Sequence, residues 1–357
     1  MKFLRAILKK IRQFRSWHRY IWKGEDHDNI YVTPHMNVFL RFKYALLGFS
    51  KVDYYFYDLK HNDYHNYISH KERLRLEDVN GRFAPILGEK VLFERIFGQF
   101  VNVPKTICFV KNKELLSLNK NTIQKWGGVT LILKTGKKLI AKPTRSLGGG
   151  HGVHVFSYDG KDFVLDGNSI TEDKLHDFIL KLNEYLISEF IEQNDFENSI
   201  YGLTTNTMRL ITVMNDNNRA TTVFAAHRFG THESIPVDNA CNGGIFANIN
   251  LDNGELTSCH CYNHPREEYL VHPDSKTKIK GCLVPHFKEL LSSLENAHNC
   301  FPYYKFFAWD VISGNDGKFY ICEINRGSGL RPWQMNEPLR NAPLGQWMQK
   351  EGLLDKW

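Results

Sequence analysis

Residues 309–325 read WDVISGNDGKFYICEIN, and this segment is the most informative part of the sequence. Asp316-Gly317 is a strong signal for a two-residue hairpin turn, and an apolar strand flanks it on each side. With the turn at the centre, counting outward along the two strands places Asp310 directly opposite Glu323. Asn325 shares their face of the sheet because strand side chains alternate. A slip of the register by one residue would instead separate the two carboxylates.

The opposed carboxylates predict a cation site. Two carboxylates that face each other repel, which destabilises a hairpin unless a cation lies between them. Asp, Glu and Asn supply only oxygen ligands, a set that suits Mg²⁺ rather than zinc. Mg²⁺ held in this way usually completes its shell with water and nucleotide phosphates. We therefore expect Asp310, Glu323 and Asn325 to bind Mg²⁺. The alternative is a solvent-facing hairpin with a chance acidic pair.

A lysine followed by a glycine-rich loop is the second signal. Residues 139–143, LIAKP, read as a buried strand containing Lys142, and TRSLGGGHGV follows at 144–153. Glycines let backbone N–H groups approach phosphate oxygens, and the lysine adds positive charge beside them. The loop lacks Gly-Lys-Ser/Thr and leads into a strand, which excludes a Walker A loop and the dinucleotide fingerprint. The alternative is a flexible surface loop, and in either case we expect His151 at the loop tip rather than as a base.

Together the two segments resemble the ATP-grasp superfamily over about residues 85–335. The resemblance implies an α+β fold in which two subdomains clasp ATP beneath a glycine-rich flap. It also implies a hinge strand, here residues 186–191, whose Glu189 reads adenine and ribose; a solvated strand residue is the alternative for Glu189. The nucleotide ligands that it implies are Lys90, Lys142, Ser146, Gly148, Gly149, Gly150, Gly152, Glu189, Phe190 and Ile191, and the metal ligands are Asp310, Glu323 and Asn325.

Other segments resemble one branch, the sugar-transfer-associated ATP-grasp proteins encoded with polysaccharide biosynthesis genes. These segments are residues 207–213, 237–245 and 272–274, and Gln334. One departure concerns phosphoryl transfer, because some ligases of the superfamily carry an arginine two residues before the metal-binding aspartate. This chain has Ala308 there, so another arginine would have to supply the charge, with Arg209 and Arg326 as the candidates.

Further polar residues are candidates for substrate binding. Arg209 lies in an apolar strand, and a buried arginine needs a partner. A substrate carboxylate or phosphate would serve, and an internal ion pair is the alternative. Arg331 follows the metal hairpin and, like Arg326, could bind an anionic substrate. A loop that either faces the site or simply turns the chain contains Asp238, Asn239, Gly243 and Gly244.

The resemblance implies an ATP- and Mg²⁺-dependent carboxylate–amine ligase that works through an acyl phosphate. The acid would be a uronic acid in a glycan or sugar nucleotide, and its partner an amino acid or amine, in capsule or surface polysaccharide biosynthesis. No side-chain nucleophile is needed, which agrees with the lack of a Ser-His-Asp or Cys-His arrangement. Two alternatives stay open: a sugar phosphotransferase, and a nucleotide-binding accessory protein of a glycosyltransferase system.

Composition and charge add a membrane hypothesis. The chain has 357 residues, 42% hydrophobic and 24% charged, which is typical of a soluble, cytoplasmic globular protein, and no secretory signal is recognisable. Of the net charge of +7, much lies in residues 1–23, which carry eight basic side chains and no acid. Apolar residues recur there at helical spacing, so a basic amphipathic helix on an anionic membrane face is one interpretation. A docked surface helix is the other, and we expect no nucleic-acid partner because no such motif accompanies the charge.

The sequence divides into four parts. We expect a basic, aromatic-rich and helical region at 1–75, an α/β segment at 76–124, and the two ATP-grasp subdomains at 125–192 and 193–357. The expected elements include a helix over 88–99, strands over 106–110, 129–133, 138–142, 186–192 and 255–262, and a helix over 283–299.

The seven cysteines, at irregular spacing, suit reduced thiols. Cys259, His260, Cys261 and His264 could hold zinc, although no second ligand pair at zinc spacing follows them. The alternative is a strand end with two ordinary thiols.

Overall fold

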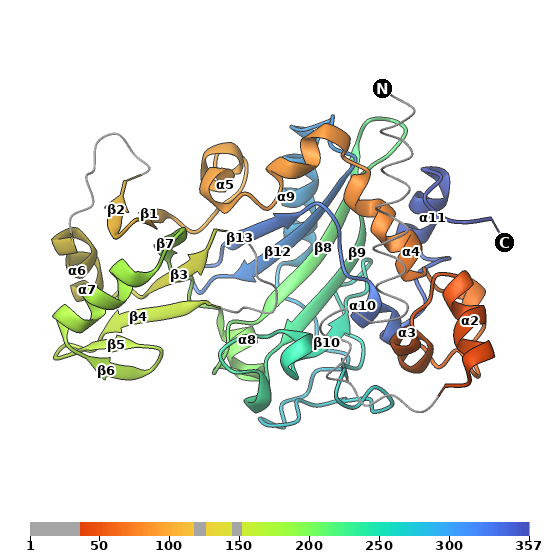
Figure 1. Cartoon of the computed structure of the whole chain (residues 1–357), viewed down its shortest axis with the longest axis horizontal. Coiled ribbons are helices and arrows are strands. Elements are labelled where there is room, and N and C mark those ends of the chain that lie inside the picture. The colour runs from red at the N-terminus through yellow and green to blue at the C-terminus, as the bar shows by residue number, and fades with distance from the viewer. Residues whose placement is uncertain (1–35, 118–125, 145–151, 357) are drawn as a thin grey trace.

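Two antiparallel sheets organise the chain (Figure 1). The structure is a computed structural model that describes residues 36–117, 126–144 and 152–356. The smaller subdomain has a seven-stranded sheet in the order β2 (Glu114–Leu116), β1 (Thr106–Lys111), β7 (Tyr185–Glu189), β3 (Leu139–Pro143), β4 (His154–Tyr158), β5 (Phe163–Leu165) and β6 (Asn168–Ile170). Helices α6 (Trp126–Lys134) and α7 (Glu172–Lys181) pack on this sheet around a core that includes Leu133, Leu139 and Phe156. The sheet therefore joins strands from both sides of the expected boundary at 124/125.

The larger sheet has six strands. Their order is β11 (His260–Cys261), β10 (Ile245–Asn248), β9 (Ala220–Phe229), β8 (Thr207–Met214), β12 (Phe306–Ser313) and β13 (Phe319–Asn325). The helices of this half of the chain are α8 (Asp195–Ile200), α9 (Phe287–Asn299), α10 (Arg331–Asn336) and α11 (Pro343–Lys350).

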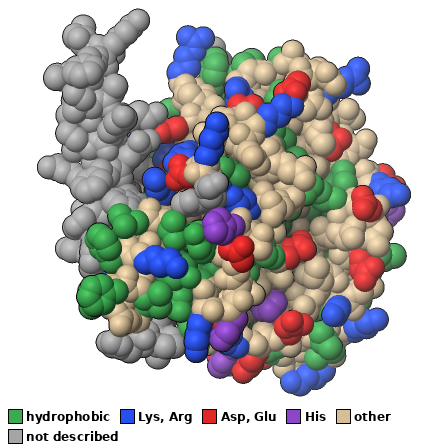
Figure 2. All heavy atoms as spheres, turned by 90° about the vertical axis from the view of Figure 1, so that its right-hand side faces the viewer, with side chains coloured by type: hydrophobic (Ala, Val, Ile, Leu, Met, Phe, Trp, Pro, Cys, Tyr) green, Lys and Arg blue, Asp and Glu red, His purple; other side chains and the backbone are tan. Residues whose placement is uncertain are grey.

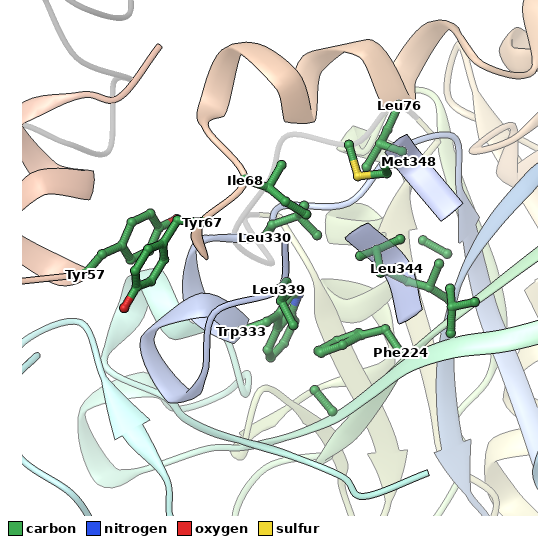
Figure 3. Close-up of a cluster of buried hydrophobic side chains, with 14 of the residues drawn as sticks. Tyr57, Tyr67, Ile68, Leu76, Phe224, Leu330, Trp333, Leu339, Leu344 and Met348 are labelled. Carbon is green, nitrogen blue, oxygen red and sulfur yellow. The ribbon is translucent and has the colours of Figure 1, made fainter. Parts of the chain in front are cut away.

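Each face of the larger sheet carries its own hydrophobic core. Leu210, Phe307 and Trp309 point to the face covered by α9. The alternate residues of the same strands, among them Ile211, Phe306 and Ala308, point to the opposite face, where Trp333 of α10 and Leu344 of α11 pack against Phe224 (Figure 3). Because both faces are buried, the strands are nearly continuous in apolar residues except at one end of this second face.

The N-terminal region covers that second face. It contains α2 (Val38–Leu46), α3 (Lys51–Phe56) and α4 (His70–Arg73), and α5 (Lys90–Phe97) follows it. Arg340 bonds both carboxylate oxygens of Glu72 at 3.0 Å, and the buried Gln334 side chain bonds the backbone of Ile68. These contacts fix the N-terminal region to the C-terminal part of the chain. None of the helices that the structure describes is long and apolar enough to cross a membrane.

Most expected elements are present, and three differ. The strand expected at 129–133 is wrong, because these residues lie in α6. Val129, Thr130 and Leu133 are buried while Leu131 is exposed, which is the burial pattern of a helix. In the sequence, so short a run fits the helical period of 3.6 residues and the strand period of 2 equally well. The strands expected at 186–192 and 255–262 are shorter, since β7 ends at Glu189 and β11 spans two residues. The helix expected within residues 1–23 lies outside the described residues.

The predicted pairing of Asp310 with Glu323 is confirmed, although the predicted turn is wrong. Gly314 and Lys318 are joined by a backbone hydrogen bond, so the loop has three residues, and Gly317 takes the left-handed φ of 77° that closes such a loop. This turn shifts the register by one residue. A bulge at Cys322 shifts it back, and the carboxylates face each other as expected.

A buried histidine beneath the larger sheet makes stability depend on pH. His298 accepts a hydrogen bond from Thr212 at Nδ1 and donates Nε2–H to the Tyr304 carbonyl, and burial lowers its pKa from 6.5 to about 4. Between these values the unfolded chain binds a proton that the folded chain does not, so the free energy of unfolding falls as pH falls. We expect a loss of about 3 kcal/mol between pH 6.5 and 4, measured by urea denaturation. His298→Gln should lose that part of the pH dependence; parallel curves for the two proteins would contradict the assignment.

Candidate active site

The candidate site lies where the apolar core of the second face ends. Along β8, β9 and β12 the residues on this face change from Ile211, Ala226 and Ala308 to Arg209, Arg228 and Asp310. Asp310 pairs across the strands with both Arg209 and Glu323, so the charged side chains form one group at the sheet end nearest the smaller subdomain (Figure 1).

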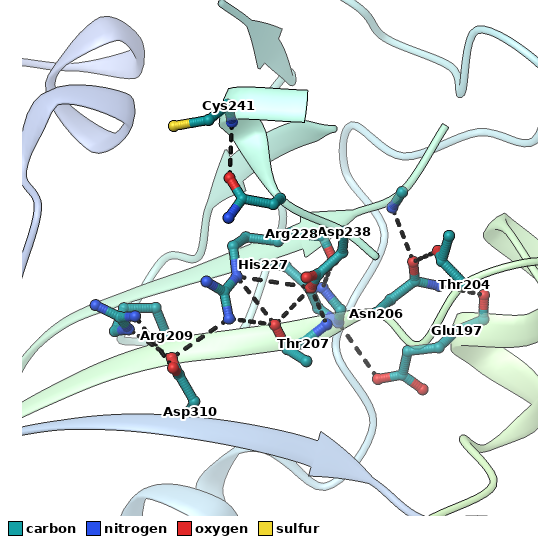
Figure 4. Close-up of polar contacts among 12 residues, drawn as sticks. Glu197, Thr204, Asn206, Thr207, Arg209, His227, Arg228, Asp238, Cys241 and Asp310 are labelled. Atoms are coloured by element: carbon teal, nitrogen blue, oxygen red, sulfur yellow. Dashed lines mark hydrogen bonds and ion pairs between the residues drawn. The ribbon is translucent and has the colours of Figure 1, made fainter. Parts of the chain in front are cut away.

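Two arginines hold the Asp310 carboxylate. Arg209 donates to both oxygens, Nε to Oδ1 at 2.6 Å and Nη2 to Oδ2 at 3.2 Å, and Arg228 Nη2 lies 3.4 Å from Oδ1 (Figure 4). Burial opposes ionisation of Asp310, but the two guanidinium groups outweigh it, and the pKa of this carboxyl is lowered. The internal ion pair, the alternative expected for Arg209, is therefore present.

Glu323 and Asn325 complete the group. Lys90 Nζ lies 3.6 Å from Glu323 Oε1, and Asn325 donates Nδ2–H to Asp310 Oδ2 at 3.3 Å. The amide oxygen of Asn325 therefore remains an available acceptor beside the two carboxylates. Lys90 comes from α5, so the residue expected to bind nucleotide lies next to the expected metal ligands.

The donor set fits Mg²⁺. Asp310, Glu323 and Asn325 offer two carboxylates and one amide oxygen on one face, which is the hard, all-oxygen set that this cation prefers. Within the described ranges no three His, Cys, Asp or Glu side chains gather as a metal cluster, so the amide oxygen is needed as the third protein ligand.

On the smaller subdomain, Lys142 lies in β3 opposite Leu186 of β7. Burial raises the pKa of the Cys322 thiol, and the positive charge of Lys142 opposes that rise, so the charge of this lysine acts on β13 next to Glu323. Of the expected flap, Ser146, Gly148, Gly149 and Gly150 lie outside the described residues, and Gly152 lies against the Tyr185 hydroxyl.

The hinge strand connects the two sheets. Glu189 ends β7 and its carboxylate lies 2.8 Å from Lys137 Nζ, while the Phe190 N–H bonds the Lys138 carbonyl. Ile191 follows, and the chain then bridges to the metal hairpin at Gly314 through Gln193. The strand expected to bind adenine therefore lies between the sheets, with Glu189 in an ion pair in this structure.

The loop that carries Asp238 is tightly built. The Asp238 carboxylate accepts hydrogen bonds from the Thr207 N–H at 2.8 Å and hydroxyl at 2.5 Å, and Arg228 Nε lies 3.6 Å away. Asn239 Oδ1 accepts from the Cys241 N–H, and the Thr231 hydroxyl donates to the Gly243 carbonyl. A Cβ at Gly244 would lie 2.5 Å from the Asp238 carbonyl, so only glycine fits this turn. The loop both turns the chain and braces Arg228.

The two remaining arginines are placed differently. Arg331 Nε donates to Asp53 Oδ1 at 2.8 Å and is nearly buried. Arg326 is 54% exposed and its guanidinium lies 3.7 Å from Glu77, so of the two candidates to replace the missing arginine at position 308, Arg209 is the one that contacts Asp310.

The zinc hypothesis is wrong for the described residues, since Cys259, His260, Cys261 and His264 do not gather there as a metal cluster. Burial raises the pKa of both thiols, and Cys261 Sγ donates to the Gly243 carbonyl. They are ordinary buried thiols.

Arg228 and Thr207 were not predicted as site residues. Arg228 interrupts the mostly apolar segment 223–229 as Arg209 interrupts its own strand, so the same reasoning about buried arginines could have found it. Thr207 carries no such signal, because a threonine at the start of a strand is common.

Known proteins resemble this chain in family and fold. Residues 70–343 match the family model described as sugar-transfer associated ATP-grasp. No curated protein sequence matches the chain.

Solved structures that resemble it include an ADP complex of purK, N5-carboxyaminoimidazole ribonucleotide synthetase (TM-score 0.43, 9% identity, covering 74% of this chain and 51% of that one). A second is the ATP-grasp ligase PsnB with a precursor variant, Mg and ADP (TM-score 0.41, 11% identity, covering 77% of this chain and 62% of that one). A third is D-alanyl-alanine synthetase A from Vibrio cholerae O1 biovar eltor (TM-score 0.42, 10% identity, covering 75% of this chain and 66% of that one). The chain thus spans about half to two thirds of these proteins, at a similarity too low to transfer an activity.

Removal of Arg209 should leave Asp310 only partly compensated. Both side chains are nearly buried, at 12% and 13% exposure, so we expect Arg209→Gln to lower the free energy of unfolding by about 3 kcal/mol. Arg326→Gln, which breaks an exposed contact, is the matched control and should change it by less than about 0.5 kcal/mol. In urea denaturation the double variant Arg209→Gln/Asp310→Asn should lose less than the sum of the single losses. Additive losses would show that the pair is not coupled.

Proposed function

The chain belongs to the sugar-transfer associated ATP-grasp family and has the α+β ATP-grasp fold, and from this premise we propose that it is an ATP- and Mg²⁺-dependent carboxylate–amine ligase. One observation carries the proposal: Asp310 and Glu323 face each other beside Lys90, Arg209 and Arg228. We assign the nucleotide clasp to residues 125–192 and 193–357, with β1 and β2 completing the first sheet.

Basic and acidic residues have different proposed roles at the site. Lys90 and Lys142, with the glycine-rich loop, position the triphosphate between the two sheets. Asp310, Glu323 and Asn325 hold Mg²⁺, which when bound neutralises charge on the phosphates. Arg209 orients the carboxylate of the acid, because a cation held at Asp310 would offset the charge of that carboxylate and leave the charge of Arg209 for the substrate. Glu189, Phe190 and Ile191 contact the base and ribose, and Arg331 and the loop of Asp238 and Gly243 support the acid site.

The proposed chemistry needs no side-chain nucleophile. A carboxylate oxygen of the acid attacks the γ-phosphorus, the bond to the β,γ-bridging oxygen breaks, and ADP leaves with that electron pair. The amine nitrogen then attacks the acyl carbon, the bond to the phosphate oxygen breaks, and the amine proton passes to solvent as the amide forms. Positioning and electrostatics supply the catalysis, with Arg209 and Lys142 beside the transferred group. We propose a uronic acid and an amino acid or amine as substrates, in capsule or surface polysaccharide biosynthesis.

Glu323→Gln tests the metal ligand. The substitution keeps the shape of the side chain but removes the charge, and we expect ADP release, with a uronic acid and an amino acid present, to fall by at least about 100-fold. Lys318→Gln, at an exposed position of the same hairpin, is the control and should keep its activity. Hydroxylamine should trap a hydroxamate of the acid. Phosphate left on a sugar hydroxyl would favour a phosphotransferase, and ATP binding without turnover would favour an accessory protein. Full activity in Glu323→Gln would refute the metal assignment.

We also propose that the N-terminal end contacts an anionic membrane from the cytoplasmic side. Helix α2 leaves Val38, Phe39, Phe42 and Leu46 exposed by 53–85%. Figure 2 looks onto this end and shows hydrophobic side chains grouped there with basic ones nearby. Residues 1–23 add eight basic side chains and no acid on the same end of the sequence. An apolar face beside a basic segment suits a bilayer surface that carries negative charge.

The membrane proposal predicts an effect of two phenylalanines. We expect Phe39→Ser/Phe42→Ser to weaken binding to phosphatidylcholine–phosphatidylglycerol vesicles by about tenfold or more, because each ring loses its transfer into the interface. Leu131→Ser, an equally exposed apolar position on α6, should bind as the unmodified chain does. Cosedimentation measures both. Equal binding of the three proteins, or binding to vesicles of phosphatidylcholine alone, would contradict the proposal.

A further inference from the structure

A cavity of about 240 Å³ adjoins the candidate active site. One wall is formed by Arg209 and Arg228 at the ends of β8 and β9, and another by residues 329–334, which include Trp333. The third wall comes from the N-terminal region, where Tyr57 and His70 line the cavity. The same arginines that hold Asp310 therefore face a chamber closed by a part of the chain to which the sequence assigned no chemistry.

The N-terminal wall is held in place by specific bonds. Gln334 accepts from the Ile68 N–H at 2.7 Å, donates to the Ile68 carbonyl at 2.9 Å, and donates to the Tyr57 hydroxyl at 3.2 Å. Arg331 bonds the buried Asp53 at 2.8 Å. Because these contacts use buried side chains, the cavity is preformed, which reduces the ordering cost of binding.

The charge balance favours a ligand with one anionic group. Three of the lining arginines have a carboxylate partner outside the metal set: Arg73 has Glu77 at 2.7 Å, Arg331 has Asp53, and Arg228 has Asp238. The carboxylate partner of Arg209 is Asp310, one of the three proposed metal ligands. A cation bound at Asp310 would offset the charge of that carboxylate, so Arg209, which also donates a hydrogen bond to Ser328, would have charge left for one carboxylate of a ligand.

Apart from the arginines and Asp53, the lining is neutral and includes aromatic rings and hydrogen-bond donors. Among the described residues, neither the Tyr57 O–H nor the side-chain N–H groups of Asn239 donate a hydrogen bond within the protein. Burial keeps the Tyr57 phenol protonated by raising its pKa, and burial with nearby Arg73 and Arg331 keeps His70 neutral by lowering its pKa. Neutral donors beside aromatic rings suit a ring that carries hydroxyl groups.

The volume suits a small ligand. Pockets for drug-sized ligands have volumes of about 300–1,000 Å³, so a cavity of about 240 Å³ is large enough for a single sugar ring. We propose that the cavity binds the acid substrate as one sugar-acid unit, with its carboxylate at Arg209 and its hydroxyl groups at Tyr57 and Asn239. This inference rests on the proposed ligase function, and it makes the N-terminal region a determinant of substrate specificity.

Calorimetry on the full chain with Mg²⁺ and the ATP analogue AMP-PNP tests the inference. We expect D-glucuronate or D-galacturonate to bind saturably, and glucose at least about tenfold more weakly because it lacks the charge-assisted bond to Arg209. Tyr57→Phe, which removes one hydroxyl, should weaken binding of the uronate by about 2- to 10-fold and leave the affinity for AMP-PNP unchanged. Tyr303→Phe, at a half-exposed position away from the cavity, is the control and should change neither affinity.

The outcomes separate this inference from the function on which it rests. If AMP-PNP binds but neither uronate does, or if glucose binds as well as the uronates, the cavity assignment is overturned and the ATP-dependent enzyme stands. Unchanged uronate affinity in Tyr57→Phe also overturns the assignment. If AMP-PNP itself fails to bind the unmodified chain, the proposed function falls, and this inference with it.

Discussion

The charge balance around Asp310 holds the ends of three strands and the loop at 238–244 together. A nearly buried carboxylate opposite another carboxylate is unfavourable by itself, and here Arg209, Arg228 and Lys90 compensate the two acids. Asp238 and Thr207 in turn brace Arg228, so the loop at 238–244 and the ends of three strands are held by the same group of charges. The site is therefore organised before any ligand arrives.

How much of this the sequence predicts depends on the separation of the residues that make contact. The hairpin of β12 and β13 and the pairing of Asp310 with Glu323 were predictable, because they follow from a local turn signal and from the alternation of side chains along a strand. The prediction of this pairing was right although the turn was wrong. The three-residue loop shifts the register by one residue and the bulge at Cys322 shifts it back, and the hydrophobic periodicity reveals neither feature. The strand expected at 129–133 is a helix because a run of five residues, four of them apolar, fits the helical period of 3.6 residues as well as the strand period of 2.

The partners of the charged residues were harder to predict than the residues themselves. A buried arginine at position 209 indicates that an anion lies beside it, but the sequence does not identify that anion. In the structure it is Asp310, 101 residues further along the chain. The N-terminal wall of the cavity is the extreme case, because Tyr57, Ile68 and His70 gain a role only through Gln334 and its neighbours, more than 260 residues further on. Nothing in the local pattern of residues 50–73 distinguishes them from an ordinary helical extension.

The bonds between the two ends of the chain also set the order in which the molecule can be completed. Gln334 and Ile68 are 266 positions apart, and Arg75 and Asp355 are 280 apart. During synthesis on the ribosome, the strands of the smaller sheet can pair long before either contact forms, since non-local contacts must wait for their later partner. A nascent chain would thus form the smaller sheet first, and the cavity beside Arg209 would be completed only when the last helices emerge.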